Sequence, residues 1–137
     1  MDTVAVRRFL LDTHGETIAE TLQCADAVSK AWDGETVTDR AQVVKPLRAL
    51  LTKRGVLERY PTMLAEAVEA GGERMQASPV AAPPYVIVTS TGPVLRATLP
   101  GGRLVIRIEA FAVARHALPS YSRTKASSDD ALSVDYR

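Results

Sequence analysis

The chain has 137 residues, and cysteine, aromatic side chains and long apolar runs are all scarce in it. Cys24 is the only cysteine, which excludes an intramolecular disulfide and a multi-cysteine zinc site. No run approaches the roughly 18 apolar residues that a transmembrane helix needs, and the first residues lack the apolar stretch of a signal peptide. We therefore expect a cytoplasmic protein without a membrane partner.

Motifs for catalysis and for cofactor binding are also missing. His14 and His116 are the only histidines, and no H-x-x-x-H pair, G-x-S-x-G turn or glycine-rich phosphate loop occurs. His14 adjoins a turn glycine at a predicted helix junction, where we expect it to be exposed to solvent. The sequence therefore indicates a protein that is not an enzyme and has no catalytic, metal-binding or cofactor-binding residues.

Length and charge describe one ordinary domain with an uneven charge distribution. A chain this long can bury a core without disulfides or metal ions. The formal net charge of +1 excludes a uniformly basic nucleic-acid binder. Residues 1–75 hold ten basic and twelve acidic side chains, a net of −2, whereas residues 80–125 hold six basic and one acidic, a net of +5. The basic surplus therefore lies in the second half of the chain.

Residues 1–75 follow a helical periodicity. Apolar side chains recur every three or four residues, and the segment 13–16 has the form of a capping box between a first and a second helix. Pro46 interrupts a third helix or starts a new one, and Gly55 is placed to end it. The pattern predicts a cluster of three to four helices, which begin near Thr3, Glu16, Thr38 or Asp39, and Pro61.

Residues 76–84 form a proline-rich linker, and residues 85–117 then have the alternation typical of strands. The dipeptides Thr91-Gly92 and Gly101-Gly102 suit tight hairpin turns between three apolar runs. With these turns, Ala97 lies opposite Ile106 on one side and opposite Val86 on the other, and one face of the sheet is apolar throughout. The sequence therefore predicts an α+β protein, in which a three-stranded antiparallel β-meander packs on the helices to give one domain. Residues 118–137 are polar, lack a clear period and are expected to form a mobile tail.

The outward face of the predicted meander carries the basic surplus. The assumed turns place Arg96 opposite Arg107, where two like charges repel each other unless an anion lies between them. Glu109 is a diagonal neighbour that can neutralise one arginine, and an external phosphate or carboxylate is the other candidate partner. One hypothesis is therefore an anion-binding or nucleic-acid-binding face, with Tyr85 available for stacking and with four candidate arginines, Arg96, Arg103, Arg107 and Arg115.

The outward face also holds apolar side chains, and a three-stranded sheet leaves two edges unpaired. The candidate interface residues are Ile87, Val94, Val105, Phe111 and Val113. Both features favour docking to a protein partner or to a second copy of the chain. Our first functional hypothesis is therefore a non-enzymatic interaction or adaptor module, expected to be a homodimer. Nucleic-acid or anion binding through the arginine-bearing face is the alternative.

The order of helices followed by hairpins also resembles that of winged-helix regulators. The fourth predicted helix carries Glu66 and Glu69, which have the wrong sign for reading DNA, whereas the third carries Lys45 and Arg48. No wing follows the third helix directly, because the linker at residues 76–84 separates the helices from the hairpins. A winged-helix-like regulator is therefore a variant of the nucleic-acid alternative.

Two stretches of the chain resemble a known group of proteins. The string PPYVIVTSTGPVLRATLPGGRLVIRIEAF is similar to the C-terminal sheet of small uncharacterised haloarchaeal proteins. The segment VVKPLRALLTKRGVLERYPTMLAEAVEAGG is similar to the helices that precede that sheet. The resemblance implies an archaeal protein of that group. It implies no activity and assigns no functional residues.

Overall fold

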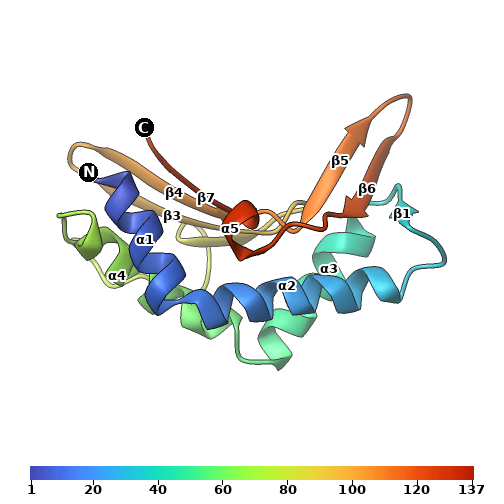
Figure 1. Cartoon of the computed structure of the whole chain (residues 1–137), viewed down its shortest axis with the longest axis horizontal. Helices are drawn as coiled ribbons and strands as arrows, with labels where there is room; N and C mark the ends of the chain where they lie inside the picture. Colours follow the sequence, from blue (N-terminus) through green and yellow to red (C-terminus); the bar gives the residue numbers. More distant parts are fainter.

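A computed structural model describes all 137 residues and places helices beneath two antiparallel sheets (Figure 1). The helical elements are α1 (Thr3–Thr13), α2 (Gly15–Lys30), α3 (Ala41–Lys53), the short 3-10 turn η1 (Leu57–Arg59), α4 (Tyr60–Ala70) and α5 (Ser128–Ala131). The strands are β1 (Thr36–Val37), β2 (Val86–Val88), β3 (Pro93–Leu99), β4 (Gly102–Ile108), β5 (Phe111–Arg115), β6 (Pro119–Arg123) and β7 (Leu132–Tyr136). The predicted α+β class is confirmed, but the structure has more strands than the sequence argument expects.

The first four helices lie close to their predicted positions. The Asp2 carboxylate caps α1 by accepting a hydrogen bond from the backbone N–H of Ala5 at 3.0 Å. Gly55 has a φ of 71° and follows the end of α3, whereas Pro46 lies inside α3 without interrupting it. The predicted capping box at residues 13–16 is wrong, because α1 includes its first residue and no side chain caps the start of α2.

Strands β2, β3 and β4 form the predicted meander, with a register that differs from the expected one by two residues at both turns. Ala97 pairs with Leu104 rather than with Ile106, and Val86 pairs with Leu95 rather than with Ala97. A shift of two residues leaves every side chain on its original face of a sheet. The predicted apolar face is therefore the buried one, and all five of these residues belong to the core.

The meander does not continue through residue 115. Strand β4 ends at Ile108, and the chain then crosses to a second sheet with the strand order β1-β6-β5. The backbone N–H groups of Ala110 and Phe111 both donate to the carbonyl oxygen of Thr91, at 2.8 and 3.0 Å, and fix the crossing point. The single long third strand that the sequence pattern predicts is therefore two strands in two sheets.

Residues 118–137 are folded, so the prediction of a mobile tail is incorrect. They supply β6, α5 and β7, and β7 pairs with β4 to complete a four-stranded sheet with the order β2-β3-β4-β7. The guanidinium group of Arg7 in α1 donates to the backbone carbonyl oxygens of Leu132, at 2.5 Å, and of Asp129. These contacts tie the end of the chain to its first helix.

Helices and sheets share one core. A single cluster of 29 buried side chains includes members of both parts, with α1 in contact with β7 and α4 in contact with β3. Tyr60 is fully buried in this core, its hydroxyl lies 2.6 Å from Thr21 Oγ1, and burial raises its pKa. Cys24 is buried as well, and burial raises the pKa of its thiol. The helices thus cover the inner face of the four-stranded sheet and leave its outer face free.

Candidate anion-binding face

The outer face of the four-stranded sheet carries a group of four arginines. Arg96 comes from β3, Arg103 and Arg107 come from β4, and Arg137 directly follows β7. Arg103 and Arg137 exchange both backbone hydrogen bonds, at 2.9 and 3.0 Å, and so stand side by side across the β4–β7 pair. All four arginines line one hollow of about 490 Å³, which we call the arginine hollow.

Val105 lies at the centre of this face. It is opposite Arg96 on β3 and Asp135 on β7, and it stands between Arg103 and Arg107 on its own strand. Only 3% of Val105 is exposed although it belongs to the outer face. The longer side chains around it therefore cover it, because arginine packs its aliphatic stem on apolar surface and keeps the charged head in water. The guanidinium groups thus surround the apolar side chain of Val105.

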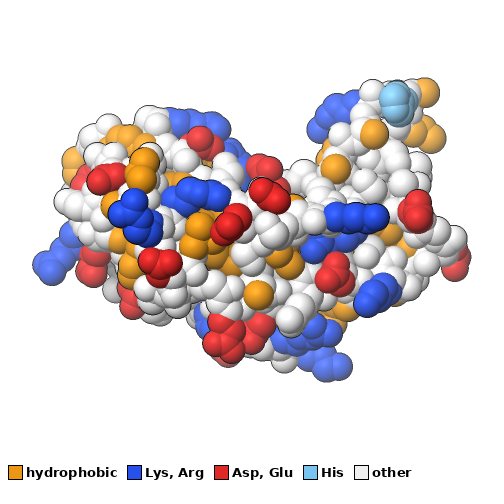
Figure 2. All heavy atoms as spheres, viewed as in Figure 1, with side chains coloured by type: hydrophobic (Ala, Val, Ile, Leu, Met, Phe, Trp, Pro, Cys, Tyr) orange, Lys and Arg blue, Asp and Glu red, His pale blue; other side chains and the backbone are white.

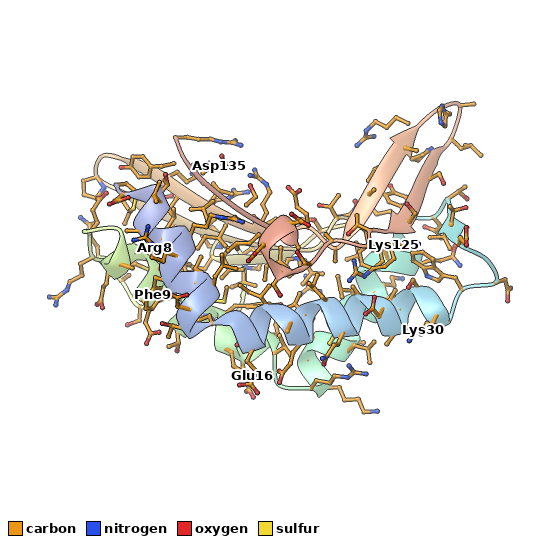
Figure 3. The ribbon with its side chains drawn as sticks, viewed as in Figure 1. Arg8, Phe9, Glu16, Lys30, Lys125 and Asp135 are labelled. Atoms are coloured by element: carbon orange, nitrogen blue, oxygen red, sulfur yellow. The ribbon has the colours of Figure 1, made fainter.

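One of the four arginines has a carboxylate partner. Arg107 Nη1 donates to Asp135 Oδ2 at 2.9 Å, and Figure 3 shows Asp135 on the far side of the sheet from α2. Four pairs of basic and acidic side chains occur in the chain, and Arg96, Arg103 and Arg137 take part in none of them. Three guanidinium groups are therefore free to bind an anion with two-pronged geometry.

The pairing of the predicted arginines differs from the expected one. Arg96 lies opposite Val105 rather than opposite Arg107, and Arg107 lies opposite Val94. Arg96 and Arg107 are therefore diagonal neighbours, which places more distance between their charges than a direct pair would have. The reason is the shift of two residues at the second turn, which keeps both side chains on the outer face but displaces them along it.

Arg115 and Glu109 lie outside the arginine hollow, whereas Arg137, which the sequence did not reveal, lines it, and Asp135, equally unforeseen, pairs with one of its arginines. Arg115 is on β5 in the other sheet, and Glu109 forms no ion pair. Asp135 takes the neutralising role, and Arg137 adds the fourth guanidinium group. Both belong to the expected tail, where a strict alternation of apolar and polar residues from Leu132 onward is the signal that could have revealed them.

Tyr85 lies next to the arginine hollow, as the stacking hypothesis requires. A second hollow, of about 200 Å³, shares Arg96 and Thr98 with the first. Tyr85 lines this second hollow, which we call the tyrosine hollow, and its backbone carbonyl accepts a hydrogen bond from Arg96 N at 2.8 Å. The remaining lining residues come from the end of the helical part and from the linker, and they are Met75, Gln76, Ala77 and Pro84.

The five candidate interface residues do not form one exposed patch. Val94 and Val105 are 8% and 3% exposed, and Phe111 is 2% exposed, with its ring centroid 5.8 Å from that of Trp32. Ile87 and Val113 are partly exposed, but Ile87 is in the four-stranded sheet and Val113 is in the three-stranded one. Three of the five candidate interface residues are therefore buried, and the other two lie in different sheets.

The histidines and carboxylates show no separate chemical site. The prediction that His14 is exposed is wrong, because its side chain is only 14% exposed and its Nε2 lies 2.7 Å from Glu66 Oε1. This contact joins the α1–α2 junction to α4. No group of three or more histidine, cysteine, aspartate or glutamate side chains is arranged to hold a metal ion.

None of the helices combines the length and the apolar character that crossing a bilayer requires.

Nearly the whole fold, from α1 to β7, matches one protein family. Residues 4–137 correspond to the family model described as Domain of unknown function (DUF7988). The chain belongs to the DUF7988 family. All residues of the arginine hollow and of the tyrosine hollow therefore lie within the DUF7988 domain. Comparisons with curated proteins and with solved structures found no match.

Proposed function

We propose that this DUF7988 domain binds a multiply charged, phosphate-bearing ligand on the outer face of its four-stranded sheet. The observation that carries the proposal is the arginine hollow, in which four guanidinium groups converge and only Arg107 has a carboxylate partner. Guanidinium groups recognise phosphate oxygens through paired, charge-assisted hydrogen bonds. The proposed role is therefore binding rather than catalysis.

The arrangement also lowers the cost of holding an anion. Arg96 lies opposite Val105 and is partly buried, which restricts the freedom of its side chain before any ligand arrives. Like charges that crowd one face of a sheet destabilise it, and an anion placed between them relieves this repulsion. Binding to this face is therefore favoured both by direct contacts and by the removal of an unfavourable term.

The Arg96→Ala/Arg103→Ala double variant is expected to weaken binding of a labelled, mixed-sequence single-stranded oligonucleotide by about tenfold or more at low salt. The slope of log affinity against log salt should also become shallower, by about 0.7 for each phosphate contact that is lost. Fluorescence anisotropy at two or more salt concentrations measures both quantities. Arg107 is left in place because it pairs with Asp135.

A matched control removes two basic side chains elsewhere. Lys45 and Arg48 are exposed on α3, one helical turn apart, and the Lys45→Ala/Arg48→Ala variant should bind the oligonucleotide like the unmodified protein. Failure of the unmodified protein to bind either an oligonucleotide or inorganic polyphosphate at low salt would remove the proposal. Loss of binding only in the α3 variant would instead favour the winged-helix-like alternative.

Homodimerisation through β5 is a second candidate function. β5 pairs only with β6, so its other edge has unpaired backbone groups, and its hairpin projects from the body on the side away from the helices (Figures 1 and 2). Ala112 and Ala114 on this strand are exposed and uncharged, and Leu118 at the tip is 67% exposed. Arg115 at the end of β5 is the only charged residue of this strand, and a free edge with so little charge favours pairing with the same strand of a second copy.

A lysine on this edge is expected to prevent such pairing. Sedimentation velocity over a range of protein concentrations should show a dimer for the unmodified chain and a monomer for Ala114→Lys, because charged side chains block edge-to-edge contact. Ala49→Lys adds the same charge on the exposed side of α3 and should remain dimeric. A monomer at every concentration for the unmodified chain would exclude this second function.

A further inference from the structure

We infer that the ligand of this DUF7988 domain is a nucleotide unit, with its phosphate in the arginine hollow and its base in the tyrosine hollow. The inference rests on the proposed function and narrows it, because an anion alone needs only the first hollow. It assigns a role to the linker at residues 76–84, which the proposed function does not use.

The two hollows are adjacent and are lined by different kinds of side chain. Arg96 and Thr98 belong to both linings, so the hollows meet at these two side chains. The arginine hollow has four guanidinium groups and no aromatic side chain in its lining. The tyrosine hollow is lined by three larger apolar or aromatic side chains, those of Met75, Pro84 and Tyr85. A phosphate fits the first environment, and the flat face of a base fits the second.

The ring of Tyr85 is held in place before a ligand binds. Tyr85 is partly buried and packs against the core cluster, and its neighbour Pro84 lines the same hollow. Its backbone carbonyl is fixed by the hydrogen bond from Arg96 N, at 2.8 Å. Stacking on an aromatic ring that is already ordered costs little conformational entropy. Arg96 on β3 and Tyr85 in the turn directly before β2 thus present a phosphate-binding group and a stacking surface side by side.

Two further side chains can satisfy the polar parts of a nucleotide. Gln76 lines the tyrosine hollow and has both a donor and an acceptor for the edge of a base. Thr98 is exposed where the two hollows meet, and its hydroxyl can donate to or accept from a sugar or a phosphate oxygen there. Inorganic phosphate or a protein carboxylate would leave Gln76 and the ring of Tyr85 unused.

Three probes of matched charge separate recognition of the base from recognition of the anion. We compare a ten-residue oligothymidylate, an abasic deoxyribose-phosphate strand of the same length and inorganic polyphosphate of similar chain length. The oligothymidylate is expected to bind more tightly than either other probe, by about tenfold or more, because base–aromatic stacking adds to the phosphate contacts. Equal affinity for all three probes would overturn the inference and leave the proposed function standing.

Variants of Tyr85 test the position of the base. Tyr85→Ala should lower the affinity for oligothymidylate by about tenfold and leave the affinity for polyphosphate unchanged, whereas Tyr85→Phe keeps the stacking ring and should retain affinity for both. A Tyr85→Ala protein that binds oligothymidylate as well as the unmodified protein does would overturn the inference. If that variant does not fold, the three-probe comparison on the unmodified protein decides.

The remaining outcomes identify the source of the nucleotide or the failure of the underlying proposal. Thymidine monophosphate that displaces the oligonucleotide at equal base concentration indicates a free nucleotide as ligand. Displacement by an unlabelled strand alone indicates a single-stranded nucleic acid. Absence of binding for all three probes at low salt removes the proposed function, and the inference with it.

Discussion

A chain that ends at Lys125 is expected not to fold. The deletion removes α5 and β7, and with them the buried side chains of Ala131 and Leu132. It uncovers one edge of β4 and takes away the two backbone carbonyls to which Arg7 donates. Domains of this size are stable by only about 5–15 kcal/mol, so the loss of a strand from the main sheet is enough to unfold one. Near-ultraviolet circular dichroism and amide dispersion in a proton–nitrogen spectrum measure the result.

Two point variants of β7 test whether stability depends on its inward side chains rather than on the length of the chain. Leu132 is 3% exposed in the core, and Leu132→Ala should lower the free energy of unfolding by about 2–5 kcal/mol in urea denaturation. Ser133 is the next residue and faces outward beside Asp135, so Ser133→Ala should change that free energy by no more than about 0.5 kcal/mol. A truncated chain with a native spectrum and a cooperative transition would contradict this account of β7.

The sequence is most informative where local chemistry decides the structure. Gly55 ends α3 because it adopts a positive φ that other residues avoid, so the glycine in the sequence predicts the end of the helix. The apolar face of the meander is also predictable, because the alternation of side chains survives a shift of two residues. Arg96, Arg103 and Arg107 were assigned to one face for the same reason, and they line one hollow.

The crossing after β4 depends on a contact that local patterns do not encode. Residues 103–115 are apolar and alternating enough for one long strand. The break at Glu109-Ala110 arises because Thr91, nearly twenty residues earlier, accepts hydrogen bonds from the backbone of Ala110 and Phe111. Arg115 consequently lies in a different sheet from the other predicted arginines. The break between β4 and β5 can therefore be recognised only when the position of Thr91 beside Ala110 is known.

The composition of the last residues concealed the rest of the candidate site. Polar and small residues at positions 119–130 suggested disorder, and the period-two alternation from Leu132 to Tyr136 is too short to stand out beside them. That short strand nevertheless supplies Asp135, the neutralising partner of Arg107, and leads to Arg137. The net charge of +1 therefore gave no sign of an arginine cluster, because the four arginines come from segments that are far apart in sequence.

Gly92→Ala is expected to destabilise the protein by about 3–5 kcal/mol, measured as the free energy of unfolding in urea. Gly92 has a φ of 140°, a backbone conformation that residues with a side chain rarely adopt. A methyl group at this position would also overlap the backbone carbonyl oxygen of Ile108, at the end of β4. Gly92 cannot move freely, because its carbonyl oxygen accepts hydrogen bonds from both the N–H and the hydroxyl of Thr89, at 3.0 and 2.7 Å. Ile108 is also held, because it pairs with Leu132 and the N–H of the next residue, Glu109, donates to Ala131 O at 2.8 Å.

Gly34→Ala is the matched control for this substitution. Gly34 lies in the loop after α2 without a positive φ, and a methyl group there would meet no atom within 4 Å. The control variant should be as stable as the unmodified protein or more stable by up to about 1 kcal/mol, because alanine reduces the entropy of the unfolded chain. If Gly92→Ala and Gly34→Ala unfold at the same urea concentration, the close approach of β4 to the turn before β3 is wrong. The relative placement of the strands that carry Arg96 and Arg107 would then be wrong as well, since that turn sets where β3 begins.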